Sequence, residues 1–365
     1  MDDIIYVDSS EKLASIVQEL KKEKELAIDI EMENNLHHYG MYVSVIQIGT
    51  REQQYLFDML AIKDLGLLAD LFTSPRIQKV FHDVSFDLRI LHYQYNLSVR
   101  SIFDTKLAAQ FLDKPHIGLG DLLEEYFSIQ KIKKYQMADW TKRPLSKEMM
   151  AYAAKDTRWL LDLHEQLSKE LEQKKFYEYY LEECLHLEEK DWSQKLPSFD
   201  SLKGFSSLQD VEKTLLEAYY FFRERLAEQL DKPPHFIISN KLLLEFAKHP
   251  PQTLQEWKKI RRVHPRVRGQ AQKLHRLTLQ AKEKPKTYLV KKAKRFTQAQ
   301  RNHFAVLNHC KENVARKTSL PGFLIISKEQ MQDIVLQKNL DMLRSWQKKL
   351  LLSICDSDQL LCLQN

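Results

Sequence analysis

The stretch 25–32 constrains the fold most, because apolar residues and carboxylates alternate along it. Ile28 and Ile30 fall on one side of this pattern, and Asp29 and Glu31 fall on the other. A β-strand has a side-chain period of two, so we expect the two carboxylates to project side by side from one face of a sheet. Neighbouring like charges repel unless a positive group neutralises them, and a divalent metal held by oxygen ligands is an economical neutraliser. A strand with one solvated face would show the same alternation, so a metal site requires further ligands elsewhere in the chain.

Composition places the chain among globular proteins. With 365 residues and 43% hydrophobic content, it is long enough for two or three domains with cores of their own. The four cysteines are widely scattered without CxxC spacing, which argues against a disulfide framework or a zinc module and favours a reducing compartment. No run approaches about 20 apolar residues and the N-terminus lacks the features of a signal peptide, so we expect a cytoplasmic protein without a membrane span.

Positive charge is concentrated in one segment. Sixteen Lys or Arg residues and a single acid, Glu283, lie between Lys258 and Arg301, giving this segment a net charge of +15 in a chain of net charge +6. The remainder therefore carries −9, and a basic segment on an acidic body favours contact with nucleic acid. A solvated helical surface is the alternative, although such a surface usually mixes both signs. The candidate nucleic-acid-binding residues follow Trp257; they are Lys258, Lys259, Arg261, Arg262, Arg266 and Arg268.

The first 190 residues predict a mixed sheet flanked by helices. Alternating and β-rich runs predict strands at 3–8, 25–32, 43–48, 54–57, 79–82 and 101–103. Helical periodicity and capping residues predict helices over 11–23, 63–73, 85–95 and 105–113, with further helical pattern to about residue 190. A strand meander followed by strand–helix alternation is typical of a mixed sheet with helices on its faces.

The half beyond residue 200 reads as all-helical and contains an internal repeat. A shift of 88 positions superposes Ala227 on Ala315, Pro233 on Pro321, and the run 237–239 on 325–327. Each repeat predicts a helix, a proline-marked loop, a short helix that begins at Ser239 or Ser327, and further helices. An unbroken offset through several features indicates two related helical modules.

Three further polar residues complete a candidate catalytic set. Asp87 lies in the first turn of the expected helix 85–95, where the helix dipole also favours an acid. Tyr152 and Asp156 are four residues apart, and so share one face of a helix. Seen alone, such a pair is an ordinary surface feature.

The order of these motifs resembles the DEDD 3′–5′ exonucleases. Asp29-Ile30-Glu31, Asp87 behind Phe81-His82, and Tyr152-Ala153-Ala154-Lys155-Asp156 follow the family's order, and the tyrosine four residues before the last aspartate is the mark of the DEDDy branch. The wider pattern, with Asp139-Trp140, Arg143-Pro144-Leu145 and Val45-Ile46-Gln47-Ile48, is similar to bacterial ribonuclease D. Region 207–285 looks like an HRDC domain.

This resemblance implies an architecture of an α/β ribonuclease H-like exonuclease domain followed by two all-α HRDC-like domains. The expected boundaries are an exonuclease domain over 1–192, a linker over 193–206, a first HRDC domain over 207–285, and a diverged HRDC-like domain over 286–365.

The resemblance also implies a chemistry. Asp29, Glu31, Asp87 and Asp156 would hold two divalent cations, Mg²⁺ or Mn²⁺, and Tyr152 would orient the attacking water, because an unperturbed phenol is too weak a base to deprotonate it. The expected function is a 3′–5′ exoribonuclease that releases nucleoside 5′-monophosphates, with tRNA precursors as substrate, no small-molecule cofactor and a monomeric state. A DNA-directed exonuclease and a non-catalytic RNA-binding protein are the alternatives.

Several residues depart from the pattern or allow a second interpretation. Ile30 replaces a frequent threonine without changing a ligand, and the segment 33–38 is unusual for the family. Asp83 lies one turn from Asp87 and could compete as a ligand. His82 is expected to be structural, and Asp104 to cap the following helix and brace the site. Gln47, Lys155 and Arg143 are candidates for phosphate contact.

Overall fold

The computed structural model describes residues 4–62, 65–130, 134–193, 198–289 and 296–361. The chain divides into two compact units. The first comprises Met1–Glu31, Val43–Trp192 and Arg295–Asn365, and the second comprises Met32–Tyr42 and Ser193–Lys294. This division groups the C-terminal helices with the sheet, whereas the domain boundaries expected from the sequence separate them; those boundaries stay predictions.

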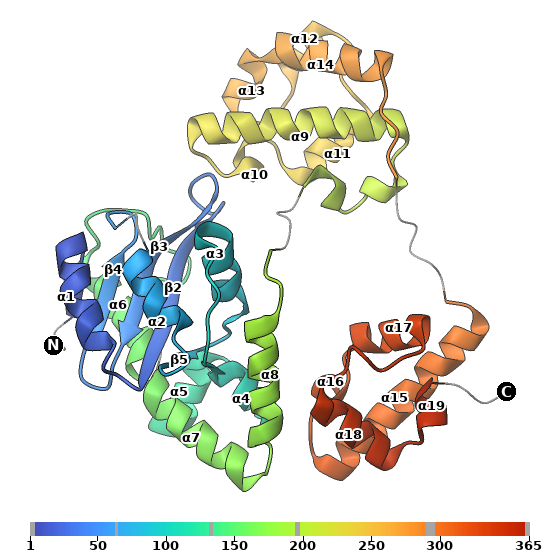
Figure 1. Ribbon diagram of the computed structural model, residues 1–365. Coiled ribbons are helices and arrows are strands. Elements are labelled where there is room, and N and C mark those ends of the chain that lie inside the picture. Colours follow the sequence, from blue (N-terminus) through green and yellow to red (C-terminus); the bar gives the residue numbers. More distant parts are fainter. Residues whose placement is uncertain (1–3, 63–64, 131–133, 194–197, 290–295, 362–365) are drawn as a thin grey trace. The chain divides into compact units, whose positions relative to one another are not determined.

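A six-stranded mixed sheet forms the centre of the first unit, with the strand order β1-β4-β3-β2-β5-β6 (Figure 1). Strand β1 runs parallel to β4, β4 antiparallel to β3, and β5 parallel to both β2 and β6. The expected mixed sheet is therefore confirmed. The strands are β1 (Ile4–Val7), β2 (Glu25–Asn34), β3 (Met41–Gly49), β4 (Gln54–Asp58), β5 (Gln78–Phe81) and β6 (Ile102–Asp104).

Eight helices accompany the sheet in the described part of residues 4–193. They are α1 (Ser10–Leu20), α2 (Gly66–Thr73), α3 (Ser85–Tyr95), α4 (Thr105–Phe111), α5 (Leu119–Phe127), α6 (Lys147–Arg158), α7 (Leu160–Gln173) and α8 (Tyr177–Glu189). Side-chain caps define several of their starts: Ser9 accepts a hydrogen bond from a first-turn N–H of α1, Asp104 does so for α4, and Ser146 for α6. Such caps satisfy N–H groups that have no partner within the helix.

Helices α6, α7 and α8 pack against β4, β5 and β6 respectively. Ala27 of β2 lies in the same buried cluster as the apolar residues of α7, whereas Ile28 and Ile30 are buried on the other side of the strand. Because side chains alternate along a strand, Asp29 and Glu31 lie on the face of Ala27, toward α6 and α7.

The helical half contains the expected repeat. Helix α9 (Asp210–Leu230) and helix α15 (Gln298–Thr318) are both 21 residues long and are displaced by 88 positions. The same displacement relates α10 (Pro234–Ile237) to α16 (Gly322–Ile325), and α11 (Asn240–Lys248) to α17 (Lys328–Gln337). Ser239 caps α11 and Ser327 caps α17, so the repeat and its two capped helices are confirmed.

Each copy ends in further helices. The first copy continues with α12 (Leu254–Lys259), α13 (Pro265–Gly269) and α14 (Ala271–Glu283) around a core that contains the fully buried Trp257. The second copy, which we call the C-terminal module (298–361), continues with α18 (Ser345–Ile354) and α19 (Ser357–Leu361) and belongs to the first unit. Two short 3-10 helices, Phe199–Ser201 and Phe205–Ser207, precede α9. In the part of the chain that the structure describes, no helix is long and apolar enough to cross a membrane.

Candidate active site

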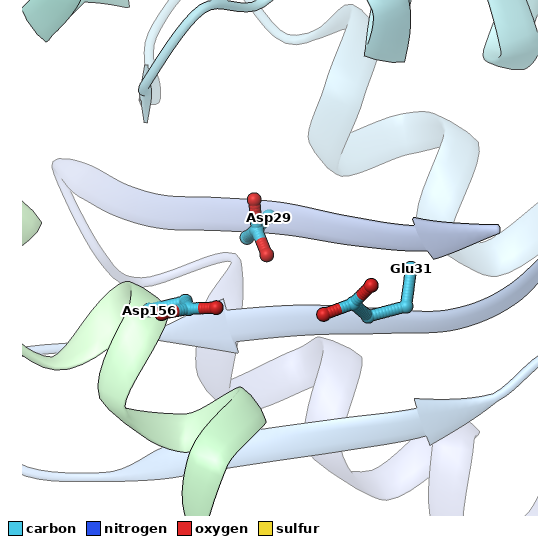
Figure 2. A group of neighbouring side chains, drawn as sticks. All are labelled: Asp29, Glu31 and Asp156. Atoms are coloured by element: carbon cyan, nitrogen blue, oxygen red, sulfur yellow. The ribbon is translucent and has the colours of Figure 1, made fainter. Parts of the chain in front are cut away.

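Three carboxylates converge at the edge of α6. Asp29 and Glu31 project from β2, and Asp156 reaches them from α6 (Figure 2). One ligand oxygen from each side chain lies within 4.8 Å of those of the other two. Like charges at this spacing repel, so the arrangement favours a bound cation.

Local contacts hold α6 in this place. Its first turn is capped by the Ser146 hydroxyl, which accepts a hydrogen bond of 3.1 Å from the Met149 N–H. In its last turn, the Thr157 hydroxyl donates to the side-chain carbonyl of Gln54 in β4 over 2.6 Å, within the core. Ala153 is fully buried against the sheet. Asp156, which is only 5% exposed, is therefore fixed by its neighbours on the same helix.

The fourth expected ligand, Asp87, lies outside the group of three that meets the 4.8 Å spacing. Its side chain is buried in the first turn of α3. Burial raises the pKa of Asp87 well above its usual range, and the negative charges of Asp29, Asp104 and Asp83 raise it further. Since the charge of Asp29 is the largest of these charge effects, Asp87 lies within electrostatic reach of one of the three converging carboxylates.

Asp104 fixes the start of the helix that carries Asp87. Its carboxylate accepts hydrogen bonds from the backbone N–H groups of Asp83 and Val84 at 2.9 and 3.1 Å, and also from the first turn of α4. The expected helix cap is thus confirmed, and it joins α4 to α3. The carboxylate of Asp83 forms an ion pair of 2.5 Å with Lys106, which engages the acid that we considered as a competing ligand.

Tyr152 lies on the same face of α6 as Asp156 and is 7% exposed. Its ring packs against Tyr135 and Trp140, with centroid separations of 5.5 and 6.1 Å. Burial raises the pKa of the Tyr152 hydroxyl, and the charges of Asp156, Glu31 and Asp29 raise it further. The hydroxyl therefore keeps its proton at neutral pH, and the negative charges of all three carboxylates act on it.

Arg143 has a structural role that sequence reasoning missed. Its guanidinium binds the carboxylate of Asp58 through two hydrogen bonds of 2.6 and 2.7 Å, and it donates to the backbone carbonyls of Trp140 and Ser44. The hydroxyl of Tyr6 donates to the same carboxylate. The phosphate contact that we considered for Arg143 is not what the structure shows, because the guanidinium is occupied in clamping Trp140 beside Tyr152. Because Arg143 and Asp58 are 85 residues apart in the sequence, no local sequence pattern indicates that they interact.

Two other polar residues are structural. His82 contacts the Thr105 hydroxyl through Nδ1 at 2.9 Å, as expected for a structural residue at a strand end. Gln47 is fully buried, so the phosphate contact that we considered for it is wrong. Neither its amide oxygen nor its nitrogen has a hydrogen-bond partner among the described residues. Lys155, by contrast, is exposed on α6.

The six basic candidates all lie on the surface of the second unit, in and after α12 and in α13. Trp257, which precedes them, is fully buried against Tyr219 and Phe246 and does not offer a stacking surface. Arg262 lies 3.8 Å from Glu245. The six side chains are therefore exposed cations on a segment that is anchored to the core by the buried residues Trp257 and Val267.

Comparisons with known proteins agree with this geometry. Residues 4–172 match the model of a 3′–5′ exonuclease domain, and residues 212–273 match the HRDC domain. The chain is 33% identical over 265 residues to the exosome complex exonuclease RRP6 of Saccharomyces cerevisiae, covering 68% of this chain and 36% of that protein. The chain therefore spans about a third of the length of this curated relative.

Two solved structures extend the likeness. The catalytic core of RRP6 from Trypanosoma brucei superposes with a TM-score of 0.68 at 28% identity, covering 77% of this chain and 80% of that one. RNase D from Escherichia coli superposes with a TM-score of 0.77 at 22% identity, covering 98% of this chain and 99% of that one, which shows a shared fold. The expected exonuclease domain, HRDC domain and overall fold are confirmed.

Proposed function

The chain belongs to the DEDD-type 3′–5′ exonucleases that carry an HRDC domain, and from this premise we propose that it is a divalent-metal-dependent 3′–5′ exoribonuclease. It removes nucleotides one at a time from RNA 3′ ends and releases nucleoside 5′-monophosphates. The observation that carries the proposal is the convergence of Asp29, Glu31 and Asp156, because grouped carboxylates are what a metal-dependent phosphodiester hydrolase uses to hold cations at the scissile phosphate.

The donor set fits a hard divalent cation. Two oxygens on one such cation, each about 2.0–2.6 Å from it, lie at most about 5 Å apart. One oxygen from each of the three carboxylates lies within 4.8 Å of the others, so the three meet this limit. Asp29, Glu31 and Asp156, with Asp87 as the neighbouring acid, are the residues that would hold two ions, Mg²⁺ or Mn²⁺. When bound, two such ions lower the pKa of water and neutralise charge on the phosphate and the leaving oxygen.

The protein's own groups supply orientation. Tyr152 keeps its proton and so acts as a hydrogen-bonding group that orients the attacking water, rather than as the base that deprotonates it. Trp140, held by Arg143, packs against the Tyr152 ring and restricts its movement.

The exposed cations of the second unit would retain the RNA. Neutralising phosphates gives affinity without sequence choice, and it makes binding strongly salt-dependent. Replacing Lys258, Lys259 and Arg261 by glutamine should raise KM, leave kcat unchanged and flatten the salt dependence. The matched control replaces three lysines of the first unit by glutamine: Lys12, Lys21 and Lys22. Equal effects of both triple variants would contradict the assignment.

One assay tests the activity. Purified protein is incubated with labelled RNA or DNA of the same sequence in Mg²⁺ or Mn²⁺, beside an Asp29→Asn control. Stepwise release of 5′-monophosphates from RNA alone is expected. Preferred cleavage of DNA would favour the DNA-directed alternative, and binding without cleavage would favour a non-catalytic RNA-binding protein.

We propose tRNA precursors as the substrate class, since Escherichia coli RNase D, which shares the fold, is an exoribonuclease involved in structured RNA processing. A precursor with a 3′ extension should be shortened to the mature end faster than an unstructured RNA is degraded. Buried free thiols at Cys184, Cys310 and Cys355 support a reducing compartment such as the cytoplasm. A monomeric state is expected, and light scattering during size-exclusion chromatography measures it.

A further inference from the structure

Helix α18 of the C-terminal module carries a tryptophan that packs on the helices beside the sheet. The Trp346 ring lies 5.2 Å from Tyr179 of α8 in a stacked arrangement, and 5.6 Å from Phe111 of α4, both measured between ring centroids. Its indole N–H donates to Glu183 over 3.0 Å, and its backbone N–H donates to Glu182 over 3.1 Å. Trp346 is only 3% exposed, so these contacts form a packed and hydrogen-bonded joint.

The next contact leads from this joint to the sheet. Phe111 packs edge-on against Tyr180, with ring centroids 6.0 Å apart, and both residues are fully buried. The Tyr180 hydroxyl accepts a hydrogen bond of 2.7 Å from the backbone N–H of Asp104 and donates to the Asp104 carbonyl at 3.2 Å. The backbone of Asp104 is therefore held from the side of α8.

The side chain of Asp104 continues the connection into the active site. It accepts hydrogen bonds from the N–H groups of Asp83 and Val84, which immediately precede α3. Asp87 occupies the first turn of this helix, buried among the negative charges of Asp29, Asp83 and Asp104. Because these charges repel Asp87, its position has to be imposed by the packing of α3 rather than by attraction within the site.

We propose that the C-terminal module positions Asp87 for metal binding, acting through Trp346, Phe111, Tyr180 and Asp104. The module is then a working part of the nuclease site. Residues that orient metal ligands from outside the coordination sphere typically contribute about 10–100-fold to metal affinity or activity. This inference rests on the proposed function, since it assigns Asp87 to a metal site.

Two conservative variants test the connection at different points. Tyr180→Phe removes one hydroxyl and keeps the ring, whereas Trp346→Phe keeps an aromatic contact and removes the hydrogen bond to Glu183. The matched control is Tyr219→Phe, because the Tyr219 hydroxyl is equally buried and bonds Thr278 at 2.8 Å within the second unit. Thermal unfolding of all variants identifies any that fail to fold; Asp104→Asn, which retains the side-chain carbonyl as an acceptor, is the reserve variant.

The readouts are the Kd for Mn²⁺ from calorimetric titration, and kcat and KM on RNA. Tyr180→Phe and Trp346→Phe should each weaken Mn²⁺ binding and lower kcat by about tenfold with KM unchanged. In the double variant, the fold-loss of Mn²⁺ affinity and of kcat should be smaller than the product of the two single fold-losses, because both residues act through one connection. Tyr219→Phe should change neither quantity. If the wild type is active and both single variants keep its Mn²⁺ affinity and kcat, the inference is overturned and the proposed function stands. If the wild type is inactive, the proposed function is refuted, and the Mn²⁺ affinities of the variants alone decide the inference.

Discussion

The ion pair between Arg143 and Asp58 provides the sharpest test of how the site is held together. In the variant Arg143→Met, the guanidinium is lost but much of the aliphatic volume remains. Asp58 then loses both of its charge-assisted hydrogen bonds, although it keeps those from the Tyr6 hydroxyl and the Leu60 N–H. The carbonyl of Trp140 loses the hydrogen bond from Arg143 and keeps the one from the Ser44 hydroxyl.

The expected cost follows from burial. The side chain of Asp58 is 5% exposed and that of Arg143 is 23% exposed, so solvent screens the pair only weakly. Removing one partner of a buried pair costs about 3–5 kcal/mol, and the contacts that Asp58 retains place this variant at the lower end, about 3 kcal/mol. Arg51→Met is the matched control: its ion pairs with Glu25 and Asp162 are at the surface, so its cost should be about 0–1 kcal/mol.

Hydrogen exchange measures this cost locally in the full chain. A loss of about 3 kcal/mol corresponds to exchange on the order of 100-fold faster in the peptides that contain 134–158, while peptides of α9 should be unchanged. Turnover should also fall, because Trp140 no longer holds the Tyr152 ring in place. Exchange rates that match those of Arg51→Met would show that the clamp does not stabilise α6, and the reasoning would be wrong.

The pH dependence has a definite sign. Burial raises the pKa of Asp58, but the hydrogen bonds from Arg143 and Tyr6 outweigh it and hold the pKa below its usual range. A carboxyl with a lowered pKa in the folded state stabilises the fold above about pH 3.9 and loses this effect as the pH falls through the folded value. The difference between wild type and Arg143→Met should therefore be full at pH 7 and smaller at pH 3.

Three further predictions concern single side chains. Tyr152→Phe should lower kcat by at least about tenfold with little change in RNA affinity, and Tyr135→Phe is the control; parallel loss of binding and turnover would count against an orienting role. Gln47→Met should leave the free energy of unfolding, measured by urea titration, unchanged or raise it by up to about 2 kcal/mol, because the buried amide lacks hydrogen-bond partners among the described residues. A lower free energy of unfolding would contradict this prediction and indicate that the amide forms a hydrogen bond. Burial lowers the pKa of Lys79 to about 8. Since the unfolded chain binds the proton more tightly, the free energy of unfolding should rise by up to about 3 kcal/mol between pH 8 and 10, and Lys79→Met should abolish the rise.

Local patterns predicted the elements well, because their causes are local. Alternation along 25–32 placed Asp29 and Glu31 on one face of a strand, and the helix expected over 85–95 is α3 as observed. The caps at Ser239 and Ser327 were visible as residue types at a helix start. Expected bounds differ where the chain gives a weak signal. The helix expected over 63–73 begins at Gly66, the strand expected over 25–32 continues to Asn34, and the strand expected over 43–48 begins at Met41.

Contacts between distant segments could not be predicted in the same way. The four acids were named as a set only through a family resemblance, and the structure brings three of them within 4.8 Å. The clamp between Arg143 and Asp58, and the joint around Trp346, depend on how helices pack on the sheet. Neither pair carries a periodicity or a spacing that distinguishes it from an ordinary charged or aromatic residue, so only the coordinates identify them.

The two copies of the helical repeat use their tryptophans in opposite ways. Trp257 packs inward against Tyr219 and Phe246 of its own copy, whereas Trp346, offset by one residue from the matching place, packs outward against Phe111 and Tyr179. The copies are consequently not interchangeable parts. A chimera with the first copy in both places would reproduce the helices and their caps. Glu182 and Glu183 of α8 would, however, lose the hydrogen bonds from Trp346, and the C-terminal module would be connected to the sheet without this packed contact.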